Sequence, residues 1–488
     1  MPFVRIGEHA GLNRELVGGK AFSLNTMARL GLPVPPAFVL TVDECARYLS
    51  GGTLTDEVRR GLRMEVAELE RALNRTFGGG ERPLLLSVRS GAARSMPGMM
   101  DTILNLGINA DVEQRLREWT GDGRYPADSH RRFADQFRSV VGVAPPDDPW
   151  EQLEAAVGAV FRSWQSSRAT AYRRHHGMSD DGGTAVTVQA MVFGNLDDKS
   201  GTGVLFTRDP VSSASKPFGE WLPGGQGEDV VSGRSTPKPL EELSRSLAEV
   251  YEELMTAAQL LERSVRDVLD IEFTVESGTL WLLQCRVAKR SATAAIHHAV
   301  SLKREGIISA EEALARISPQ QLESFFRPRL APRAQAESVL LAAGETACPG
   351  VASGVVVTDA DEADDMAAEG VDVVLARPTT DPNDVHGMLA AVAVITEIGG
   401  ATSHAAVVSR ELNRVCVVGC GEGTLMDLAG RTVTVDATNG EILDGRLEVE
   451  TPSPDHPDIA VIRRWLRAFS DTPATAQLKS VLEIPHIH

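Results

Sequence analysis

The sequence predicts a protein of several domains in the mixed α/β and α+β classes. Its 488 residues are too many for one hydrophobic core, and at about 150 residues per domain the length indicates two to four domains. Hydrophobic residues make up 42% of the chain and charged residues 24%, which is typical of folded globular proteins. Strand-like apolar segments alternate with helix-like segments along most of the chain, and this alternation predicts the mixed class.

The first elements place two cationic residues beside glycine-rich turns. A Gly pair at 18–19 precedes a helical pattern, so Lys20 is expected at a loop-to-helix junction. An apolar strand at 84–88 then delivers Arg89 into the loop RSGAARSMPGMMDT. Glycine and small residues in this loop allow backbone N–H groups to approach an anion.

Helices and then strands are expected in the following segments. Residues 110–176 have a helical pattern that is interrupted by APPDDP at 144–149. From residue 184 the segments TAVTVQAMVF and SGTGVLFTRDP have the character of strands joined by the turn signal GNLDDKSG. The pattern therefore predicts a change from helices to strands near residue 184.

The segment DIEFTVESGTLWLLQCR predicts a hairpin that turns at ESG. On an ideal pleat Asp270 and Glu272 point to one face, as do Gln284 and Arg286 on the return strand. Phosphoryl transfer needs cations and backbone donors around phosphate oxygens, and carboxylate or amide oxygens that hold Mg²⁺. Each group alone is more often structural, but together with the lysine, the arginine and the glycine-rich loop they indicate a nucleotide site.

The second half of the chain predicts a helical connector and a smaller α/β unit. Residues 291–335 have a helical pattern with breaks at REG and PQQ, and the Pro-broken stretch 319–335 is a candidate hinge. Between 340 and 450 the strand segments VASGVVV, VDVVLAR, AVAVITE, VCVVG and TVTVD alternate with short helices. The expected domains are 1–335 with its connector, 336–450, and a tail at 451–488 that carries one helix near 459–469.

His404 is the second candidate site, within GGATSHAAVVSREL. The pattern places it at the start of a helix whose alanines and valines pack on a sheet, with small residues before it. A helix N-terminus offers exposed N–H donors to a phosphate that the imidazole could carry. The residues alone leave open a capping or core histidine.

Charge and cysteine content restrict the partners and the compartment. Lys and Arg number 49 against 67 Asp and Glu, and this net charge of −18 argues against nucleic acid or an anionic membrane as the main partner. The sequence has neither a signal peptide nor an apolar run long enough to span a membrane. Its five scattered cysteines fit reduced thiols, and the CxxxC pair at 416 and 420 lacks a second pair for zinc. A cytoplasmic enzyme is expected.

The motifs together resemble the pyruvate, phosphate dikinase family of phosphohistidine enzymes. The resemblance is carried, in order along almost the whole chain, by GGKAFSLNTMARLGLPVP, LLLSVRSGAARSMPGMMDTILNLG, GTAVTVQAMVFGN, SGTGVLFTRDP, GQGEDVV, DIEFTVESGTLWLLQCR and GGATSHAAVVSREL. The connector EEALARISPQQLESFFRP is similar to the dikinase linker, which favours this branch over phosphoenolpyruvate synthase.

The resemblance implies an ATP-grasp-like nucleotide-binding domain followed by a swivelling phosphohistidine domain, with Mg²⁺ as cofactor. By position it implies phosphate-contacting cations at Lys20, Arg89, Arg286 and Arg132, a glycine loop at Gly98, Met99 and Met100, adenosine contacts at Glu228, Asp229 and Val230, metal ligands at Glu272 and Gln284 beside Asp270, and a phosphorylated histidine at His404. Lys20, Arg89 and His404 are the expected catalytic residues. Cys285 departs from the threonine usual in this motif.

The implied reaction transfers pyrophosphoryl from MgATP to His404, releases AMP, and passes the terminal phosphoryl group to inorganic phosphate. The family continues into a pyruvate/phosphoenolpyruvate-binding barrel of at least about 200 residues, for which the segment after RRWLRAFSDTPATAQ has no room. The expected acceptor is therefore a separate barrel subunit or another small molecule.

Three alternatives stay open at this stage. Water could replace phosphate as acceptor of the terminal phosphoryl group, as in a synthase-like enzyme. The chain could instead be a non-catalytic, regulatory nucleotide-binding module, or a fragment. Thr402, two residues before His404, matches a regulatory phosphorylation site of plant dikinases, where an added phosphate would repel ATP; a hydroxyl that shapes the loop is the simpler interpretation.

Overall fold

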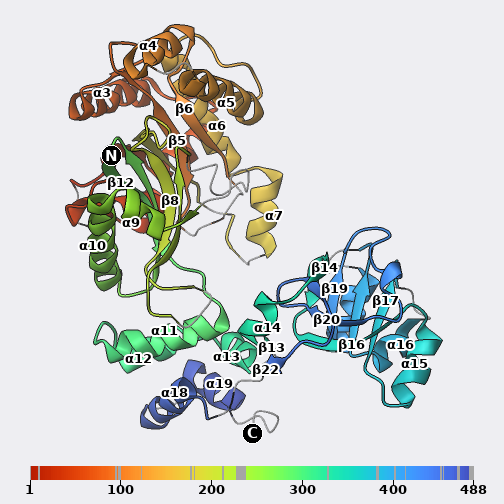
Figure 1. Cartoon of the computed structure of the whole chain (residues 1–488). Coiled ribbons are helices and arrows are strands. Elements are labelled where there is room, and N and C mark those ends of the chain that lie inside the picture. Colours follow the sequence, from red (N-terminus) through yellow and green to blue (C-terminus); the bar gives the residue numbers. More distant parts are fainter. Residues whose placement is uncertain are drawn as a thin grey trace. The chain divides into compact units, whose positions relative to one another are not determined.

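The computed structural model describes residues 2–8, 11–93, 96, 100–121, 124–175, 178–180, 182–210, 214–226, 238–326, 329–380, 384–399, 403–412, 414–450, 453, 455–469 and 473–482. The chain divides into two compact units, one formed by residues 1–294 with 304–308 and one by 295–303 with 309–488 (Figure 1). Each contains helices and sheets, which confirms the mixed α/β class. No described helix combines the length and the apolar character needed to cross a membrane.

The first unit contains an antiparallel sheet with the strand order β1-β2-β7-β5-β6. Its core gathers large side chains such as Phe38, Phe133 and Phe161, all nearly inaccessible to solvent. The strands are β1 Phe3–Arg5, β2 Ala37–Leu40, β5 Leu86–Gly91, β6 Thr102–Leu106 and β7 Ala185–Ala190. The helices that precede or accompany them are α1 Arg14–Arg29, α2 Val42–Gly51, α3 Asp56–Leu73, α4 Ala110–Thr120, α5 Arg124–Val141, α6 Pro149–Ser163 and α7 Ser167–His175, and a short pair β3 Thr76–Phe77 and β4 Pro83–Leu84 lies between α3 and β5.

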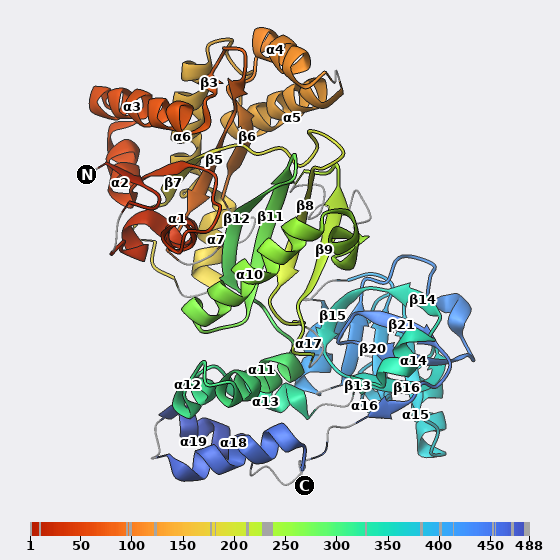
Figure 2. The ribbon, with the colours of Figure 1, turned by 60° about the vertical axis from the view of Figure 1, so that its left-hand side comes forward.

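A second antiparallel sheet of this unit has the order β10-β9-β8-β11-β12. Its strands are β8 Gly201–Phe206, β9 Phe218–Pro223, β10 Lys238–Pro239, β11 Leu269–Glu276 and β12 Thr279–Val287, and its helices are α9 Glu241–Ser246 and α10 Ala248–Val265. Figure 2 shows α10 across one face, where alternate β11 residues such as Ile271 and Phe273 join its core. The predicted strands β7 and β8 are confirmed, but the turn between them does not join a hairpin, because β7 belongs to the first sheet.

The second unit begins with a layer of helices. The predicted connector is helical, and two C-terminal helices pack on it: α12 contacts α18, and α13 contacts α19. His297 on α11 and Asp458 on α18 are 2.8 Å apart between Nδ1 and Oδ2. The bounds are α11 Ala292–Arg304, α12 Ala310–Ala315, α13 Pro319–Phe325, α14 Pro332–Ala336, α18 Pro457–Ala468 and α19 Pro473–Leu482. Residues 309–335 thus belong to the second compact unit. The expected domain boundary at residue 335 remains a prediction.

The remainder of the second unit is an α/β domain with an eight-stranded sheet of order β14-β21-β20-β16-β17-β18-β19-β15. Four central strands, β16 to β19, run parallel, and the five strands predicted from apolar segments are all present. The bounds are β14 Leu340–Ala343, β15 Glu345–Cys348, β16 Val351–Val357, β17 Val373–Arg377, β18 Ala393–Thr396, β19 Val415–Val418, β20 Thr432–Asp436 and β21 Glu441–Asp444, with helices α15 Ala360–Ala368, α16 Val385–Ala390 and α17 His404–Glu411 and the 3₁₀ turn η2 Met426–Leu428. A separate pair, β13 Arg329–Leu330 and β22 Val449–Glu450, joins the two ends of this domain.

Candidate functional site

A glycine kink brings Lys20 close to the end of strand β5. Gly18 interrupts α1 with φ 78° and ψ 161°, a conformation that glycine adopts without strain. A Cβ at this position would lie 2.0 Å from the backbone oxygen of Gly91, so only glycine allows α1 and β5 to approach this closely. Arg89 lies two residues before that contact and Lys20 two residues after the kink. Lys20 thus follows a kink inside α1 and not a loop as predicted, because α1 already begins at Arg14.

The β11–β12 hairpin presents the predicted polar residues in register. Asp270 is paired with Arg286 and Glu272 with Gln284. Arg286 Nε lies 2.6 Å from Asp270 Oδ2, and Gln284 Nε2 donates to Glu272 Oε1 at 3.1 Å. Lys20 Nζ donates to Gln284 Oε1 at 3.4 Å across 264 residues of sequence. The structure thus joins the lysine of α1 to the acidic hairpin.

Positive charges crowd this site. Burial and the charges of Arg89 and Arg286 lower the pKa of Lys20 well below its ordinary value, and the carboxylate of Glu272 only partly opposes them. Burial raises the pKa of Asp270, although Arg286 acts in the opposite direction. An anion with several negative charges would relieve the repulsion among the three cations, so the electrostatics favour a polyphosphate.

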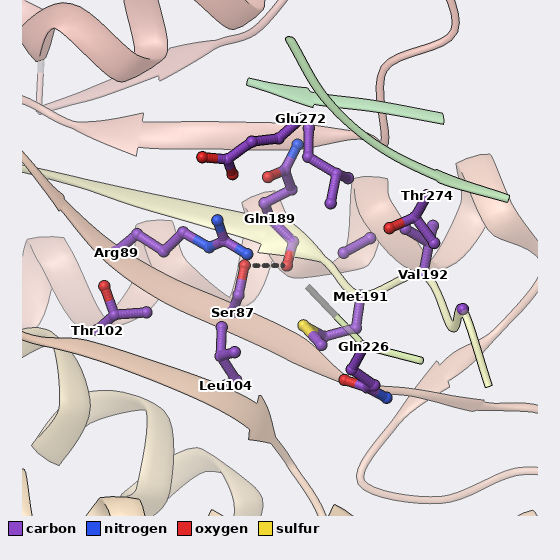
Figure 3. Close-up of a pocket in the computed structure, with 13 residues that line it drawn as sticks. Ser87, Arg89, Thr102, Leu104, Gln189, Met191, Val192, Gln226, Glu272 and Thr274 are labelled. Atoms are coloured by element: carbon purple, nitrogen blue, oxygen red, sulfur yellow. Dashed lines mark hydrogen bonds between the residues drawn. The ribbon is translucent and has the colours of Figure 1, made fainter. Parts of the chain in front are cut away.

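A cavity of about 220 Å³ adjoins these residues. Figure 3 shows Arg89 and Glu272 on one side of it and Met191, Val192 and Gln226 on the other. A pocket with a charged end and an apolar end fits a ligand such as a nucleotide, which carries phosphates at one end and a flat base at the other.

The apolar wall was missed by the sequence reasoning. It comes from the end of β7 and the residues after it, namely Ala190, Met191, Val192 and Gly194, together with Leu283 of the hairpin, while the polar residues Gln189 and Thr274 line the same pocket. These residues form no polar motif, and only their position at the end of a buried strand could have indicated them.

Glu272 and Gln284 have the chemistry of magnesium ligands. Their carboxylate and amide groups lie side by side, and the buried Oδ1 atom of Asp270 has no hydrogen-bond partner among the described residues. Mg²⁺ prefers such oxygen donors and commonly takes one or two protein carboxylates, with phosphates and water completing its shell. The described residues include no group of three or more His, Cys, Asp or Glu side chains that could hold a metal ion by themselves.

The other predicted residues lie elsewhere or are not described. Arg132 on α5 binds Asp128 with an Nε–Oδ2 distance of 2.6 Å and does not line the described pocket. Met100 packs in an apolar cluster with Trp164 and Met178. Outside the described residues are Gly98, Met99, Glu228, Asp229, Val230 and Thr402.

His404 is the first residue of α17, as predicted, although its side chain is outside the described part of the chain. Ser403 Oγ accepts the backbone N–H of Ala406 at 3.3 Å and so caps the first turn. Ala405 and Ala406 are buried against the sheet, which fixes the helix face.

Glu397, which was not identified from the sequence, forms hydrogen bonds with the loop at Leu425 and Met426. Its Oε1 accepts the backbone N–H groups of Leu425 at 2.9 Å and Met426 at 3.3 Å, and these bonds lower the pKa of the carboxyl group. Gly421 N in turn donates to the backbone oxygen of Glu397 at 3.0 Å. The segment that precedes His404 is therefore anchored at Glu397.

Comparison with known proteins relates both candidate regions to one family. The model "Pyruvate phosphate dikinase, AMP/ATP-binding domain" matches residues 14–75 and 60–246, which include Lys20 and Arg89. The model "PEP-utilising enzyme, mobile domain" matches residues 370–440, which include His404.

Curated relatives extend the similarity over almost the whole chain. Identity is 38% to pyruvate, phosphate dikinase of Rhizobium meliloti (strain 1021), over 96% of this chain and 61% of the relative. It is 37% to the chloroplastic pyruvate, phosphate dikinase of Mesembryanthemum crystallinum, over 95% of this chain and 56% of the relative. It is 38% to the pyruvate, phosphate dikinase of Clostridium symbiosum, over 90% of this chain and 57% of the relative. The chain spans less than two thirds of the length of these relatives. With both domain models matched in order, the chain belongs to the pyruvate, phosphate dikinase family.

Proposed function

We propose that this protein is an AMP-forming phosphotransferase that uses MgATP to phosphorylate His404. The observation that carries the proposal is the convergence of Lys20, Gln284 and Glu272 beside a pocket lined by Arg89. The lowered pKa of Lys20 supports it, because a site that crowds cations in the absence of ligand is organised for an anion.

In the proposed reaction the neutral imidazole of His404 attacks the β-phosphorus of ATP. A nitrogen–phosphorus bond forms, the bond between the α-phosphate bridging oxygen and the β-phosphorus breaks, and AMP leaves with that oxygen. Lys20, Arg89 and Arg286 neutralise the charge on the transferring oxygens. Mg²⁺, which Glu272 and Gln284 would hold, supplies further charge neutralisation when it is bound.

The second proposed step transfers the terminal phosphoryl group of pyrophosphoryl-His404 to inorganic phosphate. Pyrophosphate forms and a monophosphorylated histidine remains. We propose that an ATP-grasp-like first unit and a swivelling phosphohistidine domain share these steps, with movement of the domain toward a second site. The final acceptor would be pyruvate in a barrel domain or subunit, or another small molecule.

A second candidate reaction uses water in place of phosphate in this step. The two differ in their products: the dikinase reaction releases AMP and pyrophosphate and requires phosphate, whereas the water reaction releases AMP and inorganic phosphate without it. A single turnover with purified protein, MgATP, and phosphate present or absent therefore separates them.

The test compares wild type with His404→Ala and follows AMP and pyrophosphate by chromatography. We expect AMP in amounts close to one per protein, phosphate-dependent pyrophosphate, and no AMP from the variant. ATP binding without any AMP from wild type would favour the non-catalytic, regulatory module. AMP formation that persists in His404→Ala would remove this histidine from the mechanism. Regulation at Thr402 stays a prediction.

A further inference from the structure

Glu276, the last residue of β11, is a buried carboxylate with both oxygens directed at donors. Its Oε1 forms an ion pair with Arg75 Nη2, and its Oε2 accepts the backbone N–H of Phe193 at 2.8 Å. The side chains of Glu276 and Arg75 are only 10% and 12% exposed. In such surroundings an ion pair needs every remaining polar group satisfied, and here the Phe193 N–H satisfies the second carboxylate oxygen.

Aromatic rings enclose this pair. The guanidinium carbon of Arg75 lies 5.0 Å from the ring centre of Trp119 and 5.9 Å from that of Phe193. Tyr125 packs edge-on against Phe193 with ring centres 5.2 Å apart. Tyr125 is itself only 4% exposed, and burial together with the charge of Glu276 raises the pKa of its hydroxyl well above the ordinary value. A hydrogen bond in such a place holds its donor firmly.

The backbone N–H of Phe193, which donates to Glu276, lies within the segment that forms the apolar wall of the nucleotide pocket. Phe193 itself is fully buried, but Met191 and Val192 before it and Gly194 after it line the cavity. Thr274, two residues before Glu276 on the same face of β11, lines it as well. Gly194 is also confined, because a Cβ there would lie 2.3 Å from the backbone oxygen of Gly225.

Residues Glu272, Thr274 and Glu276 therefore form a row along one face of β11. Glu272 and Thr274 line the pocket, whereas Glu276 holds the backbone N–H of Phe193 behind the residues of its apolar wall. Glu276 is not among the described residues that line the cavity, so it would act on a ligand only through the main chain that it holds.

We propose that Glu276, oriented by Arg75, is a positioning residue that fixes the main chain at 191–194 as the wall that recognises the nucleotide base. The inference rests on the proposed function, since it assumes that the pocket binds ATP with its base at the apolar end. It predicts that Glu276 affects binding of the base and leaves binding of the phosphates unchanged.

The chemistry of glutamine provides the means to test this. Both donors, the guanidinium and the Phe193 N–H, need an acceptor, and an amide has one acceptor oxygen only. With Glu276→Gln one donor must face the amide NH₂ group. When Arg75→Met removes the guanidinium, the same glutamine can give its oxygen to Phe193. A methionine at 276 in that background offers no acceptor.

The decisive pair is therefore R75M/E276Q against R75M/E276M, which both lack the buried charges and differ in the acceptor. Calorimetry gives the Kd of MgATP and of magnesium tripolyphosphate, a probe that has phosphates but no base. We expect R75M/E276Q to bind ATP within about threefold of wild type and R75M/E276M about tenfold more weakly, a loss on the scale of one hydrogen bond. The Kd of magnesium tripolyphosphate should be the same for wild type and both double variants. Binding of this probe also shows that each variant is folded.

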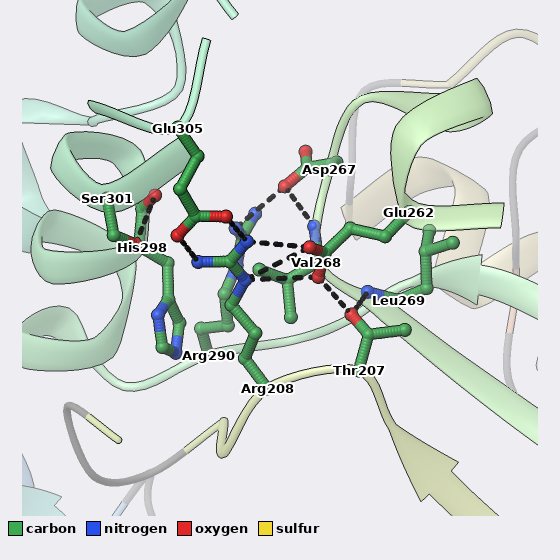
Figure 4. A network of polar contacts seen from close by, with 10 residues as sticks. All are labelled: Thr207, Arg208, Glu262, Asp267, Val268, Leu269, Arg290, His298, Ser301 and Glu305. Carbon is green, nitrogen blue, oxygen red and sulfur yellow. Dashed lines mark hydrogen bonds and ion pairs between the residues drawn. The ribbon is translucent and has the colours of Figure 1, made fainter. Parts of the chain in front are cut away.

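Glu262→Gln is the matched control. Figure 4 shows Glu262 at Arg208, and this pair is similarly buried, with exposed fractions of 11% and 5%, but does not line the pocket. The Kd values of this control for MgATP and for magnesium tripolyphosphate should equal those of wild type, even if its melting temperature is lower. Equal ATP affinity in the two double variants, or equal loss of tripolyphosphate and ATP binding, would overturn the inference alone. A wild-type protein that binds no ATP would overturn the proposed function as well.

Discussion

Replacing Lys20 with methionine is expected to weaken nucleotide binding without weakening the fold. Among the described residues, Lys20 Nζ has one hydrogen bond, the 3.4 Å contact to Gln284, and it faces the charges of Arg89 and Arg286. An ammonium group has three donors, so in the proposed function the others would meet phosphate oxygens. Methionine keeps the unbranched shape and removes the charge.

The magnitude follows from the contacts that are lost and kept. A hydrogen bond to a charged group is worth about 1.5–3 kcal/mol, so the Kd of MgATP should rise by about 10- to 150-fold. The ligand-free protein loses a partly buried cation that two arginines repel, so its free energy of unfolding should stay constant or rise by about 1 kcal/mol.

Calorimetry with MgATP and thermal melting with and without ATP measure both effects. Lys199→Met is the control, because Lys199 is an exposed residue of the same unit and its replacement removes the same charge. The control should leave Kd unchanged. A Kd within about twofold of wild type for Lys20→Met, or a strong loss of stability in the ligand-free variant, would refute the reasoning.

Three further predictions concern other parts of the account. Because the pKa of Lys20 is lowered in the folded protein, the unfolded chain binds one more proton in the pH range between that pKa and 10.5. The free energy of unfolding of wild type, measured by urea titration relative to Lys20→Met, should therefore rise with pH across that range. A difference that does not change with pH would contradict this prediction. Glu272→Gln should raise the Mg²⁺ concentration that half-saturates ATP binding by about tenfold or more, measured by titration at fixed ATP, and an unchanged value would remove Glu272 from the metal site. His297→Ala should speed limited proteolysis within residues 455–482, because it removes the contact of His297 on α11 with Asp458 on α18. His386→Ala is the control and should leave the rate of proteolysis unchanged, because the partner of His386, Asp361, is 90% exposed.

Local pattern was enough to predict much of this structure. The β11–β12 hairpin follows from its alternating strands and a turn with positive φ at Ser277 and Gly278, and so does the placing of Asp270 and Glu272 on one face. The pairing of Asp270 with Arg286 depends on a register shift between Glu272 and Phe273 that the pattern did not predict. The helix start at His404 follows from the small residues before it, and the five central strands of the second unit follow from their apolar runs.

Contacts between distant segments could not be predicted in the same way. Nothing local indicates that Arg75 meets Glu276 across 201 residues, or that β7 and β8 belong to different sheets. Helix α19 was not predicted from the sequence, because a short helix of this kind is stabilised mainly by its packing on α13 and not by its local sequence. These features depend on tertiary packing, which overrides local propensity.

The most direct test of the central claim follows label from ATP to His404. Wild type is incubated with MgATP labelled at either the β- or the γ-phosphate, with and without inorganic phosphate, and labelled peptides are mapped under alkaline conditions that preserve phosphohistidine. The account predicts β-label on His404 in both cases, and γ-label that leaves the protein as pyrophosphate only when phosphate is present. Label on another residue, or AMP formation with no labelled protein, would contradict it.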